Sequence, residues 1–519
     1  MNKIYVVDLS NKSVEAINYD VKAYKHYGRG LAVDLMEKYV APQVDRYDSE
    51  NAVIMAPGLF TGTYIPTTGR LVVATKKHKE KGAQINNMSG SIAQRIASLN
   101  IAAVVIKGNY EEGLCSLIIS HKGIEIISSE DLKGAEVSKS IEVMRKIYGK
   151  DASIIGIGPS GEALLPLSTL FSTYPEGDPV YYCSRGGVGD VFGVKGIKSI
   201  VVAEESYFKA EVFDQESLEI SAKRLGKLMV SDPVCGTALP GYGSITLMKM
   251  LKAGRNIKIE KIKKKANTTI LENKINRTCS PICVIGCLNR HCKDENSIFS
   301  SPAESEAYAA LKQCFNIDDM KFTSEFNNKA FELGLDSTEL IFACALYLKA
   351  ENIEGTKEVL NGLLEEIKNL SIVGRVVGSR TEGIYSLYKE KKELKPMVSR
   401  PSTREEGNFN VKLINKDKFP EISDLELLYG EIITLENLGF CLFSSFALID
   451  NKDALEIITE LYHAKTGGKC TGEEIIKYSL SCLEKELSYE AKAKGVSVEK
   501  TIPEFVKVLY RYFDNKINE

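Results

Sequence analysis

Three cysteines, Cys279, Cys283 and Cys287, stand at equal spacing within nine residues, and Cys441 follows far downstream. Thiols this close together in an intracellular chain favour a metal or iron–sulfur centre over disulfides. A distant fourth ligand would close the centre across two parts of the chain. Such a centre would stabilise the fold as well as carry charge, so this grouping constrains the chain more than any other feature.

The spacing of the thiols leaves the identity of the centre open. Four thiolates suit zinc as well as a [4Fe–4S] cluster, and buried free cysteines are common in protein cores. The equal spacing argues against unconnected core residues. Pro281 and Gly286 suit a loop that wraps closely around a cluster. On spacing alone, iron–sulfur is favoured only modestly over zinc.

Composition limits the class of protein and its partners. A chain of 519 residues is too long for one core, so several domains are expected. A net charge of −2 gives no reason to expect nucleic acid or an anionic membrane as partner. No apolar stretch reaches the roughly 18 residues that span a bilayer, and the N-terminal residues lack the apolar core of a signal peptide. We therefore expect a cytoplasmic protein with reduced or metal-bound cysteines.

Short β-branched runs punctuated by glycine predict strands in the N-terminal part of the chain. The clearest of these runs are residues 52–56, 70–75, 102–106, 153–157 and 199–203. Helical periodicity then takes over, most clearly in residues 217–230 and 337–349. A polar stretch over about 376–420 predicts a long loop, and helical patterns return from Asp424. No internal repeat is apparent.

These patterns predict an α+β protein with a β-rich N-terminal domain followed by two mainly α-helical domains. The predicted limits are 1–204 for the β-rich domain, 205–375 for a helical domain with the cysteine cluster, and 376–519 for a helical C-terminal domain.

Two glycine-rich turns are candidate binding loops. The segment Arg185–Gly193 could let backbone amides approach a phosphate or a flat cofactor. A tight turn between a strand and a helix is the alternative, and no clear strand precedes the segment, which argues against a dinucleotide fingerprint. Arg70 ends another turn and could hold a phosphate or merely a surface carboxylate.

Several short motifs follow one another in a specific order over residues 1–375 and again over 424–450. They include Gly28-Arg29-Gly30, Leu59-Phe60-Thr61-Gly62-Thr63, Ile157-Gly158-Pro159, Arg185-Gly186-Gly187 and Leu239-Pro240-Gly241. In this order the chain resembles the tungsten-containing aldehyde:ferredoxin oxidoreductases, with a shortened C-terminal domain. No one motif is diagnostic, but their order along the N-terminal part is highly specific.

The resemblance implies a set of cofactors. That family holds tungsten between two pyranopterins, beside a [4Fe–4S] cluster. The resemblance assigns the cluster to Cys279, Cys283, Cys287 and Cys441, and it raises iron–sulfur well above zinc. Molybdenum in place of tungsten stays open, and Mg²⁺ bridging the pterin phosphates is a further implied ion.

The resemblance also implies residues that contact the pterins. Two loops, Phe331–Asp336 and Glu436–Cys441, would grip them. The implied contacts from these loops and the residue after the second are Leu335, Asp336, Glu436, Phe440 and Leu442. Arg70 and Arg185 would contact the pterins, and Asn87 and the Tyr182 carbonyl would lie near the magnesium ion.

The implied activity is oxidation of an aldehyde to a carboxylic acid, as in other anaerobic enzymes of this family. Electrons would pass through the cluster to ferredoxin, and a homodimer is one possible assembly. Glu306 matches an active-site glutamate that could take a proton. By sequence alone, however, Glu306 also fits an exposed charge on a helix face.

Two departures from the family pattern keep other functions open. Phe331 stands where the first loop carries an aspartate, and no histidine falls in residues 376–424, where the family has one beside the tungsten. One alternative is the same metal–pterin core acting on a different substrate. The other is a non-catalytic iron–sulfur and pterin-binding electron-transfer protein.

Overall fold

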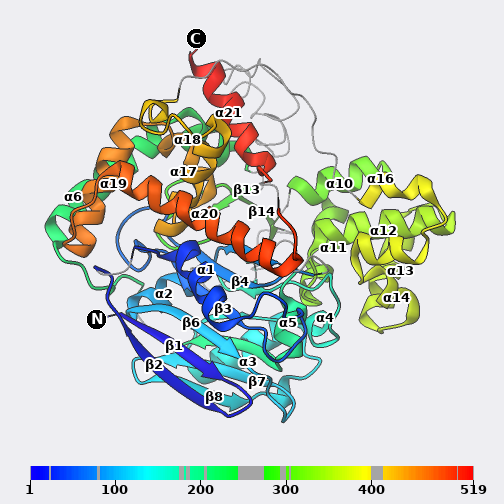
Figure 1. Ribbon diagram of the computed structural model, residues 1–519. Helices are drawn as coiled ribbons and strands as arrows, with labels where there is room; N and C mark the ends of the chain where they lie inside the picture. Colours follow the sequence, from blue (N-terminus) through cyan, green and yellow to red (C-terminus); the bar gives the residue numbers. More distant parts are fainter. Residues whose placement is uncertain are drawn as a thin grey trace.

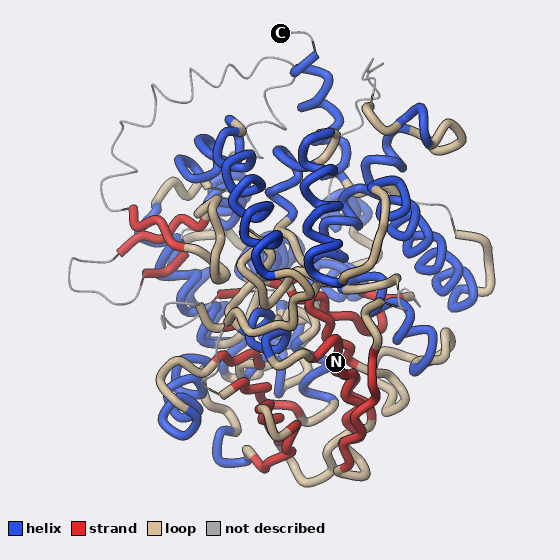
Figure 2. Tube along the Cα trace, turned by 90° about the vertical axis from the view of Figure 1, so that its left-hand side faces the viewer, coloured by secondary structure: helices blue, strands red, loops and turns tan. Residues whose placement is uncertain are grey.

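The computed structural model describes residues 2–22, 25–78, 82–174, 181–182, 187–203, 207–243, 274–292, 300–302, 305–398, 413–498 and 501–517. The N-terminal sheets lie at one end of the molecule and helices fill most of the rest (Figure 1). Figure 2 shows the same division from the side, with most strands in the lower half. Within the described ranges, no helix combines the length and apolar character needed to cross a membrane.

The first sheet has the strand order β2-β1-β6-β3-β4-β5. Its strands are β1 (Asn2–Asp8), β2 (Ser13–Tyr19), β3 (Val53–Pro57), β4 (Leu71–Lys76), β5 (Ala83–Met88) and β6 (Ile101–Lys107). β1 runs parallel to β6, and the other neighbours are antiparallel. Helix α1 (Gly28–Tyr39) covers the outer face, where Leu31 and Leu35 pack against Ile4 and Ile54.

The second sheet has the order β11-β10-β9-β12-β7-β8. Its strands are β7 (Cys115–Ser120), β8 (Gly123–Ser128), β9 (Ser153–Gly156), β10 (Phe171–Ser172), β11 (Tyr181–Tyr182) and β12 (Ile197–Val202). β7 runs parallel to β12, and the other neighbours are antiparallel. Helix α3 (Val137–Tyr148) covers the outer face through Ile141 and Met144.

One hydrophobic core joins the inner faces of the two sheets. It also includes residues of α2 (Ile92–Ser98) and α5 (Gly189–Val194). Members from the sheets include Val7, Val104, Leu117, Ile155 and Ile200. The β-branched runs predicted as strands are thus strands, and they are apolar on both sides because both faces of each sheet are covered.

The two sheets repeat one topology. The order β1-β2-α1-β3-β4-β5-α2-β6 in the first half corresponds to β7-β8-α3-β9-β10-β11-α5-β12 in the second, where the short helix α4 (Pro159–Glu162) follows β9. The parallel pair and the antiparallel pairs fall at the same places in both sheets. The repeat lies in burial and strand pairing rather than in residue identity, which is why no repeat is apparent in the sequence.

A third sheet lies within the region predicted to be helical. It consists of β13 (Lys274–Arg277), β14 (Leu288–Cys292) and β15 (Ser300–Pro302). Arg277 pairs with Leu288, so the segment between them, which carries three of the cysteines, is a hairpin loop. Ile282 and Gly286 have positive φ angles of 56° and 60°, which lets this loop turn back on itself. The loop predicted at the cysteines is therefore present, but the strands on either side of it, in a region predicted to be mainly helical, were not predicted.

The helices that follow the two N-terminal sheets form two packing groups. The first group shares a core that also takes in Phe60 of the N-terminal part, and it comprises α6 (Gln215–Ser231), α17 (Asp424–Leu438), α18 (Ser445–Leu448), α19 (Lys452–Thr466), α20 (Gly472–Lys494) and α21 (Glu504–Ile517). The second comprises α10 (Ser305–Phe315), α11 (Met320–Glu332), α12 (Ser337–Glu351), α13 (Lys357–Lys368), α14 (Ile372–Val377) and α15 (Arg380–Leu387). The helices predicted at 217–230 and 337–349 are confirmed as α6 and α12. The domain limits at 204 and 375 stay predictions.

The polar stretch predicted as a long loop is partly helical. α15 is followed by a 3₁₀ turn, η3 (Lys392–Leu394), and by α16 (Lys395–Val398). Ile384 and Leu394 are buried in the core of the second helix group, and these contacts hold an otherwise polar segment in helical form. The loop prediction is wrong here, and residues 399–412 lie outside the described ranges.

At each N-terminal sheet, a glycine lies in close contact with the loop that follows a helix. Gly58 follows β3, and a Cβ atom there would lie 2.1 Å from the backbone nitrogen of Gly439, just after α17. Gly158 follows β9, and its Cβ would lie 2.6 Å from the carbonyl carbon of Leu333, just after α11. Only glycine permits backbones to approach this closely.

We expect Gly58→Ala to lower the free energy of unfolding by about 1–3 kcal/mol. The new methyl group would overlap backbone atoms, which cannot move aside as a flexible side chain can. Gly362→Ala is the control. Gly362 lies inside α13 with nothing within 4 Å of its Cβ position, so alanine there should stabilise by about 0.5–1 kcal/mol. Urea denaturation of both variants measures the difference, and equal midpoints would contradict the close contact.

Candidate functional site

The loop after α17 is the centre of the candidate site. α17 ends at Gly439, which has a φ of 91° and so turns the chain in a conformation that glycine adopts readily. Phe440 then donates its backbone N–H to the Leu435 carbonyl at 2.8 Å and is fully buried. The turn brings Glu436 and Cys441, at its two ends, close to the first sheet.

The segment between β3 and β4 is bound to this loop by hydrogen bonds between backbone groups. The hydrogen bonds run from Leu59 N to Asn437 O (3.0 Å), from Phe60 N to Leu438 O (3.0 Å) and from Arg70 N to Gly439 O (3.1 Å). The rings of Phe60 and Phe440 also meet edge to face, with centroids 5.9 Å apart. Regular backbone pairing therefore fixes the loop against the N-terminal domain.

Thr67 joins the two cysteine-bearing segments. Its backbone N–H donates to Ile282 O at 3.0 Å, and its carbonyl accepts from Cys441 N at 3.0 Å. Its hydroxyl accepts from Val284 N at 3.3 Å. The hairpin loop of Cys279, Cys283 and Cys287 and the distant loop of Cys441 are thus hydrogen-bonded to one residue.

The four thiols lie in one electrostatic neighbourhood. Burial is the main cause that raises the pKa of Cys279, Cys283 and Cys287, to about 12 for Cys283, and the charge of the Cys441 thiol raises all three further. Arg70 opposes this effect for Cys279 and Cys287, and its Nη2 donates to Cys441 Sγ at 2.8 Å. Over the described ranges, no three His, Cys, Asp or Glu side chains stand ready to hold a metal ion, so the metal ligands stay a prediction.

Glu436 lies in a partly buried polar network. Its Oε2 accepts from Arg29 Nη1 at 2.6 Å, and its Oε1 accepts from Asn87 Nδ2 at 3.2 Å. Arg29 also reaches Glu486 through Nε at 2.6 Å and Nη2 at 2.7 Å, and the Tyr429 hydroxyl at 3.0 Å. Although burial disfavours its charge, the two carboxylates keep the pKa of Arg29 above its usual range. The structure thus brings together two predicted cofactor-binding residues: Asn87, predicted near the magnesium ion, and Glu436, predicted to contact a pterin.

Arg29 is a site residue that the sequence analysis did not single out. It stands between Gly28 and Gly30 at the start of α1, and the Gly30 N–H donates to Asn437 Oδ1 at 2.8 Å. An arginine between two glycines at the start of a helix was the available signal. The partner of Arg29 could not be found from sequence, because Glu436 lies 407 positions away.

The first loop, Phe331–Asp336, is held in the same way by the second sheet. Ser160 N donates to Leu333 O at 3.0 Å, and Thr169 N donates to Gly334 O at 2.8 Å. Leu335 is fully buried. The Asp336 carboxylate caps α12 by accepting from the N–H groups of its first turn, each at 3.1 Å. A role for Asp336 in cofactor binding stays a prediction beside this cap.

The remaining predicted site residues are placed as follows. Tyr182 pairs with Phe171 at the edge of the second sheet. Arg185 lies outside the described residues. Glu306 is half-buried in the first turn of α10, and Leu442 is half-buried against the core of the first helix group. Cys283 and Cys287 pack against that same core.

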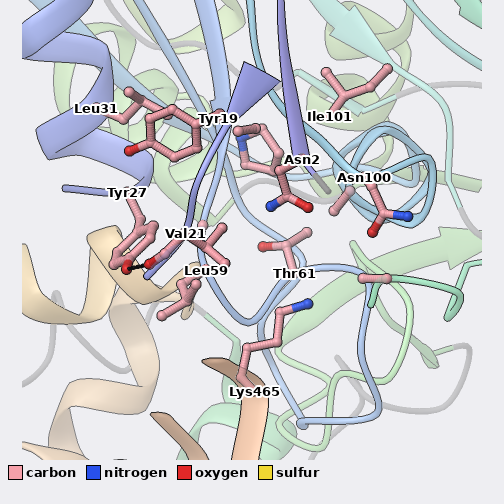
Figure 3. Close-up of a pocket in the computed structure, with 15 residues that line it drawn as sticks. Asn2, Tyr19, Val21, Tyr27, Leu31, Leu59, Thr61, Asn100, Ile101 and Lys465 are labelled. Atoms are coloured by element: carbon pink, nitrogen blue, oxygen red, sulfur yellow. Dashed lines mark hydrogen bonds between the residues drawn. The ribbon is translucent and has the colours of Figure 1, made fainter. Parts of the chain in front are cut away.

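A separate cleft lies beside the segment after β3 (Figure 3). Thr61 and Lys465 line it, together with Tyr27, whose hydroxyl donates to the Val21 carbonyl at 2.5 Å. Lys465 Nζ donates to the Glu211 carbonyl, and burial lowers the pKa of Lys465 to about 8. None of the predicted site residues lines this cleft, so no cofactor is assigned to it.

Comparisons with known proteins point to one family. Residues 4–204 match the family described as aldehyde ferredoxin oxidoreductase, N-terminal domain. The tungsten-containing aldehyde ferredoxin oxidoreductase of Pyrococcus furiosus is 26% identical, covering 94% of this chain and 88% of that protein. The Thermococcus kodakarensis enzyme of the same name is 27% identical, covering 70% of this chain and 63% of that protein.

A solved structure shares the fold over nearly the whole chain. It is the active site complex BamBC of benzoyl coenzyme A reductase with 1,5-dienoyl-CoA, which covers 95% of this chain and 89% of its own, with a TM-score of 0.75. At 17% sequence identity this likeness concerns the fold alone.

α17, which carries Glu436, also holds a buried carboxyl group. Glu431 Oε1 accepts from Asn415 Nδ2 at 2.8 Å, and Oε2 accepts from Asp450 N at 3.1 Å. Burial disfavours the charge more strongly than these donors favour it, and it raises the pKa of Glu431 to about 7. This carboxyl links α17 to the segments on either side of it.

We expect Glu431→Gln to change the pH dependence of stability. The pKa of Glu431 rises on folding from an ordinary value of 4.5, so its contribution to stability is complete below pH 4.5 and lost as pH rises through about 7. Between these limits, stability should shift in favour of the variant by about 3 kcal/mol. Urea denaturation across this pH range measures the shift, with exposed Glu216→Gln as control, and parallel curves for the wild type and Glu431→Gln would contradict it.

Proposed function

The chain belongs to the aldehyde ferredoxin oxidoreductase family, and we propose that it oxidises an aldehyde to a carboxylic acid at a tungsten or molybdenum centre held by two pyranopterins. It is an oxidoreductase. In this proposal, electrons leave through a [4Fe–4S] cluster on Cys279, Cys283, Cys287 and Cys441. Ferredoxin or a similar low-potential carrier then accepts them.

The backbone junction at Thr67 is the observation that most supports this proposal. Thr67 hydrogen-bonds both cysteine-bearing segments. Cys441 in turn shares one short turn with Glu436, which meets Asn87 on the first sheet. A cluster and a pterin bound to these residues would be neighbours, which keeps the path for electrons short.

The side chains present fit the two groups in part. Four thiols match the ligand set of a cubane cluster. The Glu436 carboxylate can accept hydrogen bonds from the N–H edge of a pterin, and the Arg70 guanidinium can hold an anionic group while donating to Cys441 Sγ. The first loop fits less well, because Phe331 offers no acceptor. A metal held by the pterins would supply the two-electron redox chemistry.

The remaining steps are proton movements that protein side chains can perform. Conversion of an aldehyde and water to a carboxylic acid releases two electrons and two protons. Glu306, half-buried in the first turn of α10, is the proposed proton acceptor. Arg70 would orient the Cys441 sulfur through its hydrogen bond.

A second candidate is the same core acting on a different substrate. Two sequence facts favour it: Phe331 replaces an acidic residue of the first loop, and none of the five histidines falls in residues 376–424. Loss of a general acid or base is commonly worth about 10²–10⁴ in rate. Metal and pterin without aldehyde-dependent reduction of a viologen dye would point to this candidate.

For anaerobically purified protein, we expect about four irons per chain, as one cubane cluster requires. Cys441→Ser should lose most of this iron, because it removes one of the four thiols. Cys470→Ser is the control, since Cys470 lies just before α20, outside both cysteine-bearing segments. Metal analysis and EPR of the reduced protein check both variants.

The outcomes of this experiment separate the candidates. An EPR signal from a reduced cluster interacting with W(V) or Mo(V) would support two neighbouring redox centres. Four irons without tungsten or molybdenum would indicate an electron-transfer protein. Zinc in place of iron would contradict the assignment of an iron–sulfur cluster to the four cysteines.

We expect Glu306→Gln to lower aldehyde oxidation by about 10²–10⁴ while metal and pterin contents stay at the wild-type level, because the amide cannot accept the proton. Glu304→Gln, two residues earlier, is the matched control and should keep full activity. Steady-state reduction of a viologen dye measures both. Loss of cofactor from Glu306→Gln would instead indicate a structural role for this side chain.

A further inference from the structure

The repeated topology of the two sheets allows their helix-end loops to be compared position by position. Matching backbone bonds hold each loop: Phe60 N to Leu438 O and Ser160 N to Leu333 O, both at 3.0 Å, and Arg70 N to Gly439 O at 3.1 Å and Thr169 N to Gly334 O at 2.8 Å. These bonds align Gly439 with Gly334. Three positions earlier, Glu436 therefore aligns with Phe331.

The alignment extends to the helix that covers each sheet. At the start of α1, Gly30 N donates to Asn437 Oδ1 at 2.8 Å. At the start of α3, Ser138 N donates to Glu332 Oε2 at 3.0 Å. Asn437 and Glu332 occupy matching loop positions, so Gly30 aligns with Ser138. The residues just before them, Arg29 and Val137, are then equivalent.

The chemistry at these equivalent positions differs between the two halves. In the first half, Arg29 and Glu436 form an ion pair at 2.6 Å. In the second half, Val137 and Phe331 are both apolar and buried, with 0% and 4% of their surface exposed. A charged pair in one half thus corresponds to two apolar side chains in the other. The joint change is physically reasonable, because Glu436 without Arg29 would be a partly buried carboxylate that lacks its ion-pair partner.

The first half keeps acceptor capacity for a ligand. A carboxylate offers about four lone-pair sites. The described hydrogen bonds to Glu436 come from Arg29 and Asn87, one on each oxygen. Further sites can therefore accept N–H donors from a flat heterocycle that lies against the loop. In the other loop, Phe331 offers a heterocycle only the surface of its ring.

We propose that this chain anchors its two pterins unequally, an inference that rests on the proposed function. The pterin against the Glu436–Cys441 loop is held through its N–H donors by the Glu436 carboxylate, which the ion pair with Arg29 holds in place. The pterin against the Phe331–Asp336 loop is held by packing, without a carboxylate at the equivalent position.

The test compares single substitutions at the two equivalent positions in the full-length protein. Glu436→Gln should reduce the pterin retained after dialysis by about tenfold or more, because a hydrogen bond from a ligand to a charged group is lost. Phe331→Leu, the matched variant, should retain pterin within about twofold of the wild type. Pterin is oxidised to its fluorescent form and counted per chain.

A second set of variants moves the charged pair into the other half. Phe331→Asp alone places a carboxylate at a buried position whose equivalent of Arg29 is the apolar Val137, so it should lower the unfolding midpoint. Adding Val137→Arg should restore much of that loss and slow the release of pterin about tenfold relative to the wild type, because a second anchor is then present.

Equal pterin loss from Glu436→Gln and Phe331→Leu overturns the inference and leaves the proposed function intact. Wild-type protein without any pterin overturns the proposed function and, with it, the ligand assigned here. The unfolding midpoints of the cofactor-free chain then test the matched positions separately. Rescue of Phe331→Asp by Val137→Arg supports the match, and absence of rescue overturns it.

Discussion

The backbone hydrogen bonds of Thr67 are the contact on which the candidate site depends. They join three segments that are far apart in the sequence: the turn before β4, the hairpin loop of the first three cysteines, and the loop of Cys441. Thr67 has a φ of 66°, a conformation that costs a non-glycine residue about 1–3 kcal/mol unless its surroundings fix it. Both of its backbone polar groups and its hydroxyl are used, so the surroundings do fix it.

Contacts next to Thr67 in the structure also pack the helical part against the sheets. Gly58 and Gly439 meet backbone to backbone, and Phe60 packs into the core of the first helix group. The redox site proposed here is therefore built where two parts of the fold meet, rather than within either one. Binding of a cluster by cysteines from both sides would reinforce a contact that backbone pairing already makes.

The sequence predicts the regular parts of this fold well, because their signals are local. Runs such as Val53–Met55 are buried on both faces of a sheet, and α12 is an uninterrupted helical pattern. The hairpin of β13 and β14 escapes such reasoning, since its strands are short, lack β-branched runs and are defined by pairing with each other. α15 escapes it because few buried contacts, notably Ile384, hold a polar segment in helical form.

The site is harder to predict than the fold, because its polar groups are paired across long separations. Glu436 could be named from a resemblance, but its partner Arg29 could not be chosen among many arginines. For Asp336 the difficulty concerns the role of the side chain rather than its partner. A carboxylate at the start of a helix suits a cap and a cofactor contact equally well in sequence, and the structure places it as a cap.

The repeated topology also has an evolutionary consequence. Two identical subunits around a twofold axis present the same residues to a ligand between them, and every mutation appears on both sides. Two halves joined in one chain are free of that constraint. Here the first half carries Arg29 and Glu436 where the second carries Val137 and Phe331. Fusion of two similar units thus allows a nearly symmetric scaffold to hold a ligand whose two sides face different chemistry.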